Sequence, residues 1–319
     1  MKQRVITALI LALILTPVTI INVPWVFNIF QLLVVSMVVI ATMEMLAMYE
    51  HEKPIKLSIK IVILILTLLT YINLGTLLKP INPTISHELQ LITLNIDPIV
   101  VISLVTLVLL ACMVFVDEFT GADIGKAFTI IYYVGLGAAS ITLLRYLGIR
   151  FIVYVALISF VTDIFAYIFG IKFGKHKMAP NISPKKSWEG AIAGSVIATL
   201  IASAFAMFYG YIFTPNGFLG SIFNPADSEG VYLITIFDNF TDIGHRDLWL
   251  QALVIVPITF FGTIAGQIGD LVASKFKRTY HIKDFGNIMP GHGGILDRFD
   301  SIMFIGILFL SIFILMTYI

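Results

Sequence analysis

The chain has 319 residues, of which 59% are hydrophobic and only 12% charged, and its formal net charge is +1. This balance gives no support to nucleic-acid binding, and the single cysteine, Cys112, excludes an intramolecular disulfide framework. Because the apolar runs are continuous rather than alternating, they argue against a transmembrane barrel and predict an all-α, polytopic bundle of transmembrane helices.

Nine apolar segments are long enough to be expected as transmembrane helices. The first follows Lys2 and Arg4 without a signal-peptide cleavage pattern, so it is expected to remain as a span. In chain order the expected helices are 5–22, 25–48, 58–78, 98–116, 127–146, 151–170, 189–213, 250–273 and 302–319.

Positive charge is divided unequally between the two sides of such a bundle. When the loops alternate sides, sixteen of the 20 lysines and arginines fall together, and four lie opposite: Lys79, Arg145, Arg150 and Arg246. Cytoplasmic loops carry the excess of cations, so the N-terminus is predicted to be cytoplasmic and the C-terminus external. The acidic segment 214–249 is then external, where a solvated cap is expected.

Four carboxylates fall within or beside the apolar segments, where an unpaired charge is costly. Asp163 lies too deep to reach water easily, which indicates a functional or buried polar role, and a functional role is also expected for Asp270. Glu189 follows Ser187 at the start of a helix, where either helix capping or a functional role fits. Gly262, Gly266 and Gly269 precede Asp270 and predict close packing of a neighbouring helix.

Glu44 lies within a turn or two of the predicted cytoplasmic end of its helix. Its side chain is therefore expected to reach the aqueous boundary or to pair with Lys53 or Lys56.

The segment "SKFKRTYHIKDFGNIMPGHGGILDRFDS", residues 274–301, combines cations, carboxylates and a glycine-rich turn between two apolar runs. Cationic side chains and exposed backbone N–H groups suit phosphate oxygens, and carboxylates suit Mg²⁺ that bridges phosphates. Two histidines and one cysteine do not make a zinc site. The segment therefore predicts a polyphosphate site with these contributors: Lys277, Arg278, Lys283, Arg298, Gly291, Gly293, Gly294, Asp284, Asp297 and Asp300.

A second basic segment, "SPKKSWEG", places Lys185 and Lys186 beside the N-terminus of the next helix, a favourable position for phosphate. This segment, which begins at Ser183, and residues 274–301 are both expected at the cytoplasmic face, where they could enclose one nucleotide.

These motifs resemble the integral-membrane phosphatidate cytidylyltransferases, also called CDP-diacylglycerol synthases. The resemblance covers residues 160–301, including "TDIFAYIFG", "SPKKSWEG" and Gly269-Asp270-Leu271, whereas the N-terminal half is only hydropathically consistent. Ala273 stands where the family frequently has Glu. The signature residues present here are Ser274, Lys277, Arg278, Lys283, Asp284, Pro290, His292, Gly293, Gly294, Asp297, Arg298 and Asp300.

The resemblance implies transfer of the cytidylyl group from CTP to phosphatidic acid, with Mg²⁺ required and pyrophosphate released. It assigns Asp270 and Asp297 to the metal, with Asp163 supporting them. It assigns Lys185 and Lys186 to closure over CTP, with Ser183, Asp284, Gly293 and Gly294 in the nucleotide site. The triphosphate would be held by Lys277, Arg278, Lys283 and Arg298, with Asp300 nearby and His292 as a positioning donor rather than a base. A monovalent cation such as K⁺ and a homodimer are also implied.

On this basis the chain is divided into N-terminal transmembrane helices, residues 1–150, and a catalytic transmembrane region, residues 151–319, with cytoplasmic loops 171–188 and 274–301. Two alternatives remain open. A CTP-dependent polyprenol or dolichol kinase would also need a nucleotide loop at this face. A secondary transporter could use Asp163 and Asp270 as ion-coupling groups, although its site would be expected near the membrane midplane.

Overall fold

The computed structural model of the chain describes residues 13–73, 89, 91–224, 230, 232–238, 242–288 and 293–316. Within these residues, seven helices are long and apolar enough to cross a membrane, and an eighth apolar helix is shorter. The strands described there form one short hairpin. The predicted all-α, polytopic class is confirmed, whereas nine spans and a cytoplasmic N-terminus stay predictions.

The chain separates into two compact units. The first comprises the described residues up to Tyr146 together with Lys275–Phe299. The second comprises the described residues of Leu147–Ser274 and those from Asp300 onward. Residues 275–299 therefore pack with the N-terminal helices, although in sequence they lie between two segments of the second unit.

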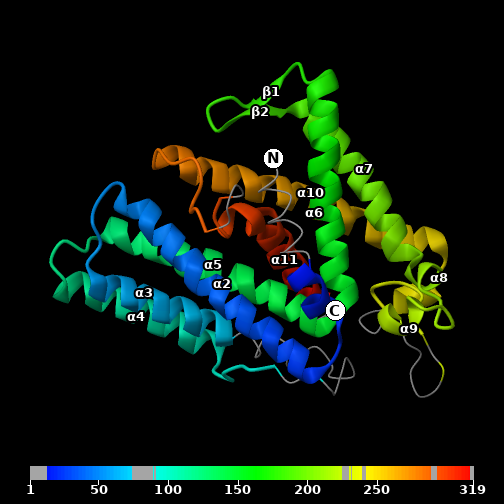
Figure 1. Cartoon of the computed structure of the whole chain (residues 1–319), viewed down its shortest axis with the longest axis horizontal. Helices are drawn as coiled ribbons and strands as arrows, with labels where there is room; N and C mark the ends of the chain where they lie inside the picture. The colour runs from blue at the N-terminus through cyan, green and yellow to red at the C-terminus, as the bar shows by residue number, and fades with distance from the viewer. Residues whose placement is uncertain are drawn as a thin grey trace. The chain divides into compact units, whose positions relative to one another are not determined.

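Helix α5 lies at the centre of the first unit. In its most apolar 18-residue stretch 67% is buried, compared with 17% of the corresponding stretch in α4. Gly135 lets α5 approach α3, because an added Cβ would lie 3.2 Å from the carbonyl oxygen of Thr67. The hydroxyls of Tyr71 and Thr142 join the same two helices at 3.1 Å. The long helices, side by side in Figure 1, are α2 (Pro24–Glu50), α3 (Leu57–Ile72), α4 (Pro98–Phe115) and α5 (Gly121–Leu147).

In the second unit, α6 (Ile149–Phe173) and α7 (Trp188–Met207) pack closely at two glycines of α7. A Cβ on Gly190 would lie 2.5 Å from the carbonyl oxygen of Ala166, so this contact requires glycine. The strands β1 (Lys177–Ala179) and β2 (Ser183–Ser187) form an antiparallel hairpin that connects the two helices in sequence and projects from the end of α6 in Figure 1. The short helices α8 (Tyr209–Ile212) and α9 (Gly220–Phe223) follow.

Helices α10 (Leu248–Thr279) and α11 (Leu296–Met316) meet through the glycines predicted to pack. An added Cβ would lie 2.8 Å from the Phe309 ring at Gly262, and 2.9 Å from the Ile305 side chain at Gly266. At Gly269 it would lie 2.7 Å from the carbonyl oxygen of Asp300. The packing role predicted for these glycines is confirmed.

Helix ends differ from the hydropathy-based prediction because charged residues extend the helices. Lys277 and Arg278 lie in the last turn of α10, and Asp297 in the first turn of α11, where their charges complement the helix dipole. Helix α10 ends where His281 takes a left-handed conformation, with φ of 55°, and the N–H of Ile282 donates to the carbonyl of Lys277 at 2.9 Å. The segment predicted as a loop over 274–301 is therefore helical at both ends.

Candidate active site

Asp297 joins the end of α10 to the start of α11. Its Oδ1 accepts from the Lys277 ammonium at 2.6 Å, and its Oδ2 accepts from the N–H groups of Phe285 and Gly294, each at 2.9 Å. The pair is largely buried, with side-chain exposures of 15% for Lys277 and 4% for Asp297. Two residues that the sequence assigned to phosphate and metal are thus in direct contact. The N–H of Gly294 is used within the fold and is not free for an anion.

Glu44 does not occupy the position predicted for it. It is buried, and its carboxylate accepts from the N–H groups of Ile295 and Leu296 at 2.9 and 3.0 Å. Lys53 instead pairs with Asp123 at 3.2 Å. The expectation of an aqueous or lysine-paired Glu44 was wrong, because the start of α11 supplies unpaired N–H donors that a carboxylate satisfies.

The remaining residues of the signature differ in exposure. Lys283 and Asp284 are exposed in the connection, and Arg278 and Arg298 are exposed on the two helices. Gly293 has φ of 89°, a conformation that favours glycine. Asp300 is buried, and its Oδ1 accepts from the N–H of Ser301 at 2.7 Å. Pro290, Gly291 and His292 lie outside the described residues.

A second ion pair lies in the second unit, where the Lys186 ammonium on β2 contacts the Asp270 carboxylate on α10. Asp163 on α6 interacts electrostatically with both residues. Lys185 on β2 is exposed, and the pairing of β1 with β2 is irregular opposite these residues. The joint role predicted for the two lysines stays a prediction. Ser183 pairs in register with Ala179 at the other end of β2.

Glu189 holds the hairpin to α7. Its carboxylate accepts from the backbone N–H groups of Lys175 and His176 and lies 2.6 Å from the His176 Nδ1. The cap of α7 is Ser187, whose Oγ accepts from the N–H of Gly190 at 3.3 Å. Of the two roles considered for Glu189, helix-cap formation belongs to Ser187, and Glu189 positions the chain that enters the hairpin.

The predicted Mg²⁺ ligands fit that ion to different degrees. Among the described residues, no group of three or more His, Cys, Asp or Glu side chains gathers. Mg²⁺ is commonly held by one or two carboxylates together with substrate phosphates, which suits Asp163 and Asp270. Asp297 fits less well, because three N–H donors already occupy its oxygens. Asp270 and Asp297 belong to different units, and their joint coordination of a metal stays a prediction.

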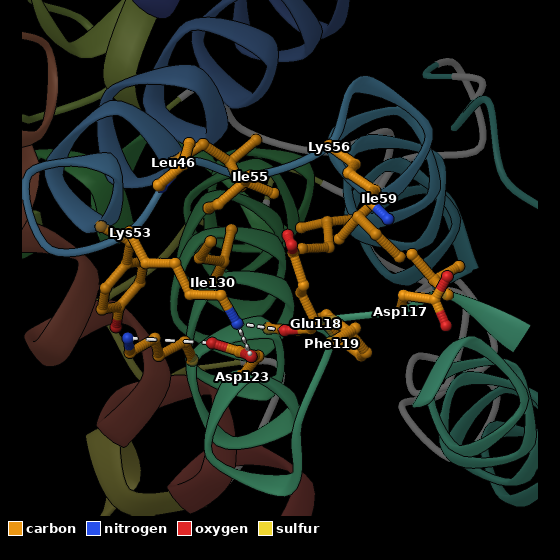
Figure 2. Close-up of a pocket in the computed structure, with 16 residues that line it drawn as sticks. Leu46, Lys53, Ile55, Lys56, Ile59, Asp117, Glu118, Phe119, Asp123 and Ile130 are labelled. Atoms are coloured by element: carbon orange, nitrogen blue, oxygen red, sulfur yellow. Dashed lines mark hydrogen bonds and ion pairs between the residues drawn. The ribbon is translucent and has the colours of Figure 1, made fainter. Parts of the chain in front are cut away.

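A pocket of about 40 Å³ opens in the first unit, beside the α2–α3 and α4–α5 connections (Figure 2). Lys53 points to Asp123 and to the carbonyl of Glu118, which has a positive φ of 72°. Lys126, also in the lining, lies 6.0 Å from the centre of the Tyr280 ring, and burial raises the pKa of that phenol. None of the residues predicted to bind nucleotide or metal lines this pocket.

Comparison with known proteins agrees with the motif assignment. The model of the cytidylyltransferase family matches residues 2–316. A phosphatidate cytidylyltransferase of Staphylococcus epidermidis is 36% identical over 189 residues, which cover 59% of this chain and 58% of the relative. Proteins of the same name from Staphylococcus haemolyticus and Staphylococcus aureus are each 35% identical over the same shares.

The matched segment thus spans less than two thirds of these curated relatives, whereas the family model extends over nearly the whole chain. This integral membrane protein, with its long apolar helices, belongs to the cytidylyltransferase family.

Proposed function

We propose that this protein transfers the cytidylyl group of CTP to phosphatidic acid, forming CDP-diacylglycerol and pyrophosphate. One observation carries the proposal: two of the carboxylates expected to handle Mg²⁺ are each paired with a lysine expected to handle phosphate, Asp270 with Lys186 and Asp297 with Lys277. Family membership and the similarity to enzymes named phosphatidate cytidylyltransferase support it.

In this reaction an oxygen of the lipid phosphate attacks the α-phosphorus of CTP. The new P–O bond forms as the bond to the α–β bridging oxygen breaks, and pyrophosphate leaves with that electron pair. The lipid phosphate is already anionic near neutral pH, so no side chain needs to deprotonate it. The protein therefore has to align the two phosphates and stabilise the negative charge that moves onto pyrophosphate.

In both pairs, the lysine ammonium could exchange its carboxylate partner for a phosphate oxygen of the substrate. Mg²⁺, when bound, would neutralise part of the triphosphate charge, and Asp270 with Asp163 is the carboxylate pair suited to hold it. Asp270 would then no longer need the Lys186 ammonium, which would be free to contact a phosphate oxygen. The Lys277 ammonium would likewise leave Asp297 and contact the triphosphate.

Radiolabelled CTP distinguishes the proposal from its alternatives. Purified protein is supplied with phosphatidic acid, Mg²⁺ and CTP labelled at either the α- or the γ-phosphate. Cytidylyl transfer places the α-label in the lipid and the γ-label in pyrophosphate. Lipid that carries the γ-label would instead identify a kinase, and no labelled lipid at all would contradict the proposal.

We also propose that the site faces the cytoplasm, in agreement with the sixteen-to-four division of cations. Cysteines replace Lys177 in the hairpin, Asp284 in the connection and Arg246 before α10, in a chain whose Cys112 is replaced by Ala. In sealed cells a membrane-impermeant thiol reagent should label only the cysteine at position 246. Labelling at positions 177 and 284 would reverse the arrangement. The monovalent cation and the homodimer stay predictions from the family resemblance.

A further inference from the structure

The connection between α10 and α11 is held by two carboxylates, of which only Asp297 belongs to the signature segment. Asp297 accepts from Phe285 and Gly294. The second carboxylate is Glu44 of α2, which accepts from the next two N–H groups, those of Ile295 and Leu296. Residues 294–296 thus donate three consecutive N–H groups to two acidic side chains.

Glu44 lies against two parts of this connection, one after α10 and one before α11. A Cβ added to Gly286, which follows α10, would lie 2.5 Å from the Glu44 Oε1. A Cβ added to Gly294, which precedes α11, would also lie 2.5 Å from this oxygen. The glycine backbones therefore pack directly against the carboxylate, and a side chain at either position would displace it.

The two carboxylates differ in what else they contact. Asp297 also accepts from the Lys277 ammonium, a partner that the proposed reaction would draw toward the triphosphate. Glu44 is 5% exposed and, within the part of the chain that the structure describes, it bonds only to backbone N–H groups. Its contacts need not change when substrate binds.

We propose that Glu44 is a positioning residue, which fixes the start of α11 while Lys277 exchanges Asp297 for phosphate. This inference rests on the proposed function for its catalytic consequence. Its structural part, the clamping of residues 286–296 by Glu44, is independent of which reaction the protein performs. Glu44 acts through Asp297 and Arg298 and need not touch substrate.

Glu44→Gln tests the proposal, because the amide keeps the volume and one acceptor oxygen but loses the charge and the second acceptor. We expect turnover to fall roughly 10- to 100-fold, as for a small misplacement of reacting groups. The KM for phosphatidic acid should stay within about twofold, because a positioning residue affects turnover rather than ground-state binding. Glu50→Gln is the matched control: it makes the same change on the same helix, removes the ion pair with Lys60, and should leave turnover unchanged.

Hydrogen exchange supplies a readout that does not require activity. In Glu44→Gln, the amides of Ile295 and Leu296 should exchange at least about tenfold faster than in the wild type, because both donors lose a charged acceptor. The amide of Ile92, which donates to Gln31 at 3.0 Å, should keep its rate and serves as an internal reference. If Glu44→Gln does not fold, Gly286→Ala displaces the same carboxylate and should give the same faster exchange.

The outcomes separate the two proposals. Faster exchange at 295–296 in Glu44→Gln, together with no cytidylyl transfer by the wild-type protein, would keep the clamp and contradict the proposed function. Wild-type exchange together with wild-type turnover in Glu44→Gln would overturn the clamp and leave the function intact. Faster exchange with unchanged turnover would overturn the positioning role and reduce Glu44 to a structural contact.

Discussion

The two lysine–carboxylate pairs of the candidate site have the same chemistry but different surroundings. Lys277 and Asp297, in the first unit, expose 15% and 4% of their side chains, whereas Lys186 and Asp270, in the second, expose 26% and 31%. Asp297 also accepts two backbone N–H groups. Among the described residues, Lys186 is the only ion-pair partner of Asp270.

This difference indicates that Asp297 contributes to the folded structure as well as to the proposed chemistry. Removal of a buried acceptor leaves its donors unsatisfied, whereas a partly exposed pair is readily replaced by water or by another ion. Asp270 can therefore exchange partners at small cost to the fold. Substitutions in the two pairs should separate loss of turnover from loss of stability.

The largest difference between loss of turnover and loss of stability is expected for Asp270→Asn. The amide keeps the volume but removes the negative charge that would hold Mg²⁺, so turnover should fall roughly 10²-fold or more. The free energy of unfolding should change by less than about 1 kcal/mol, because the lost ion pair is partly exposed. Initial rates with labelled CTP and thermal unfolding in detergent measure the two effects.

Glu52→Gln is the control for this substitution, since Glu52 is an exposed partner of Lys126 and belongs to no predicted site. Near-normal turnover in folded Asp270→Asn would contradict the metal role assigned to Asp270.

Asp297→Asn should lower both turnover and stability. One amide oxygen can still accept from Phe285 and Gly294, but the NH₂ group would then face the Lys277 ammonium, which it cannot pair with. We expect turnover to fall at least about tenfold and the free energy of unfolding to fall by about 1–3 kcal/mol. Thermal unfolding of both variants in parallel compares the stability of Asp297→Asn with that of Asp270→Asn. Equal stability of the two variants would show that the backbone contacts of Asp297 carry little weight.

The sequence predicted the helical class and the segment that carries the signature, because both depend on local composition. Continuous apolar runs identified the long helices, and interleaved cations, carboxylates and glycines identified residues 274–301. The ends of α10 and α11 were misplaced because Lys277 and Asp297 are charged yet lie within helices. Hydropathy locates the apolar part of a helix, not its last hydrogen-bonded turn.

Contacts between distant segments could not be predicted in the same way. Glu44 is 251 residues from its partner Ile295, and neither residue carries a local signal for the other. The hairpin was also missed, since its strands of three and five residues are too short for a clear alternating pattern. Both features depend on tertiary structure, and both position residues that the motif had already identified.

The same comparison applies to the two lysines, where the smallest expected loss of stability is that of Lys186→Gln. Lys277→Gln leaves the buried Asp297 without its cation, so the free energy of unfolding should fall by about 1–3 kcal/mol. Lys186→Gln breaks the more exposed pair and should cost less than about 1 kcal/mol. Both variants should raise the KM for CTP, because each removes a cation proposed to reach the triphosphate, and thermal unfolding measured beside CTP titrations tests both statements. If Lys186→Gln were the less stable variant, burial would not be what distinguishes the pairs, and the structural role assigned to Asp297 would lose its basis.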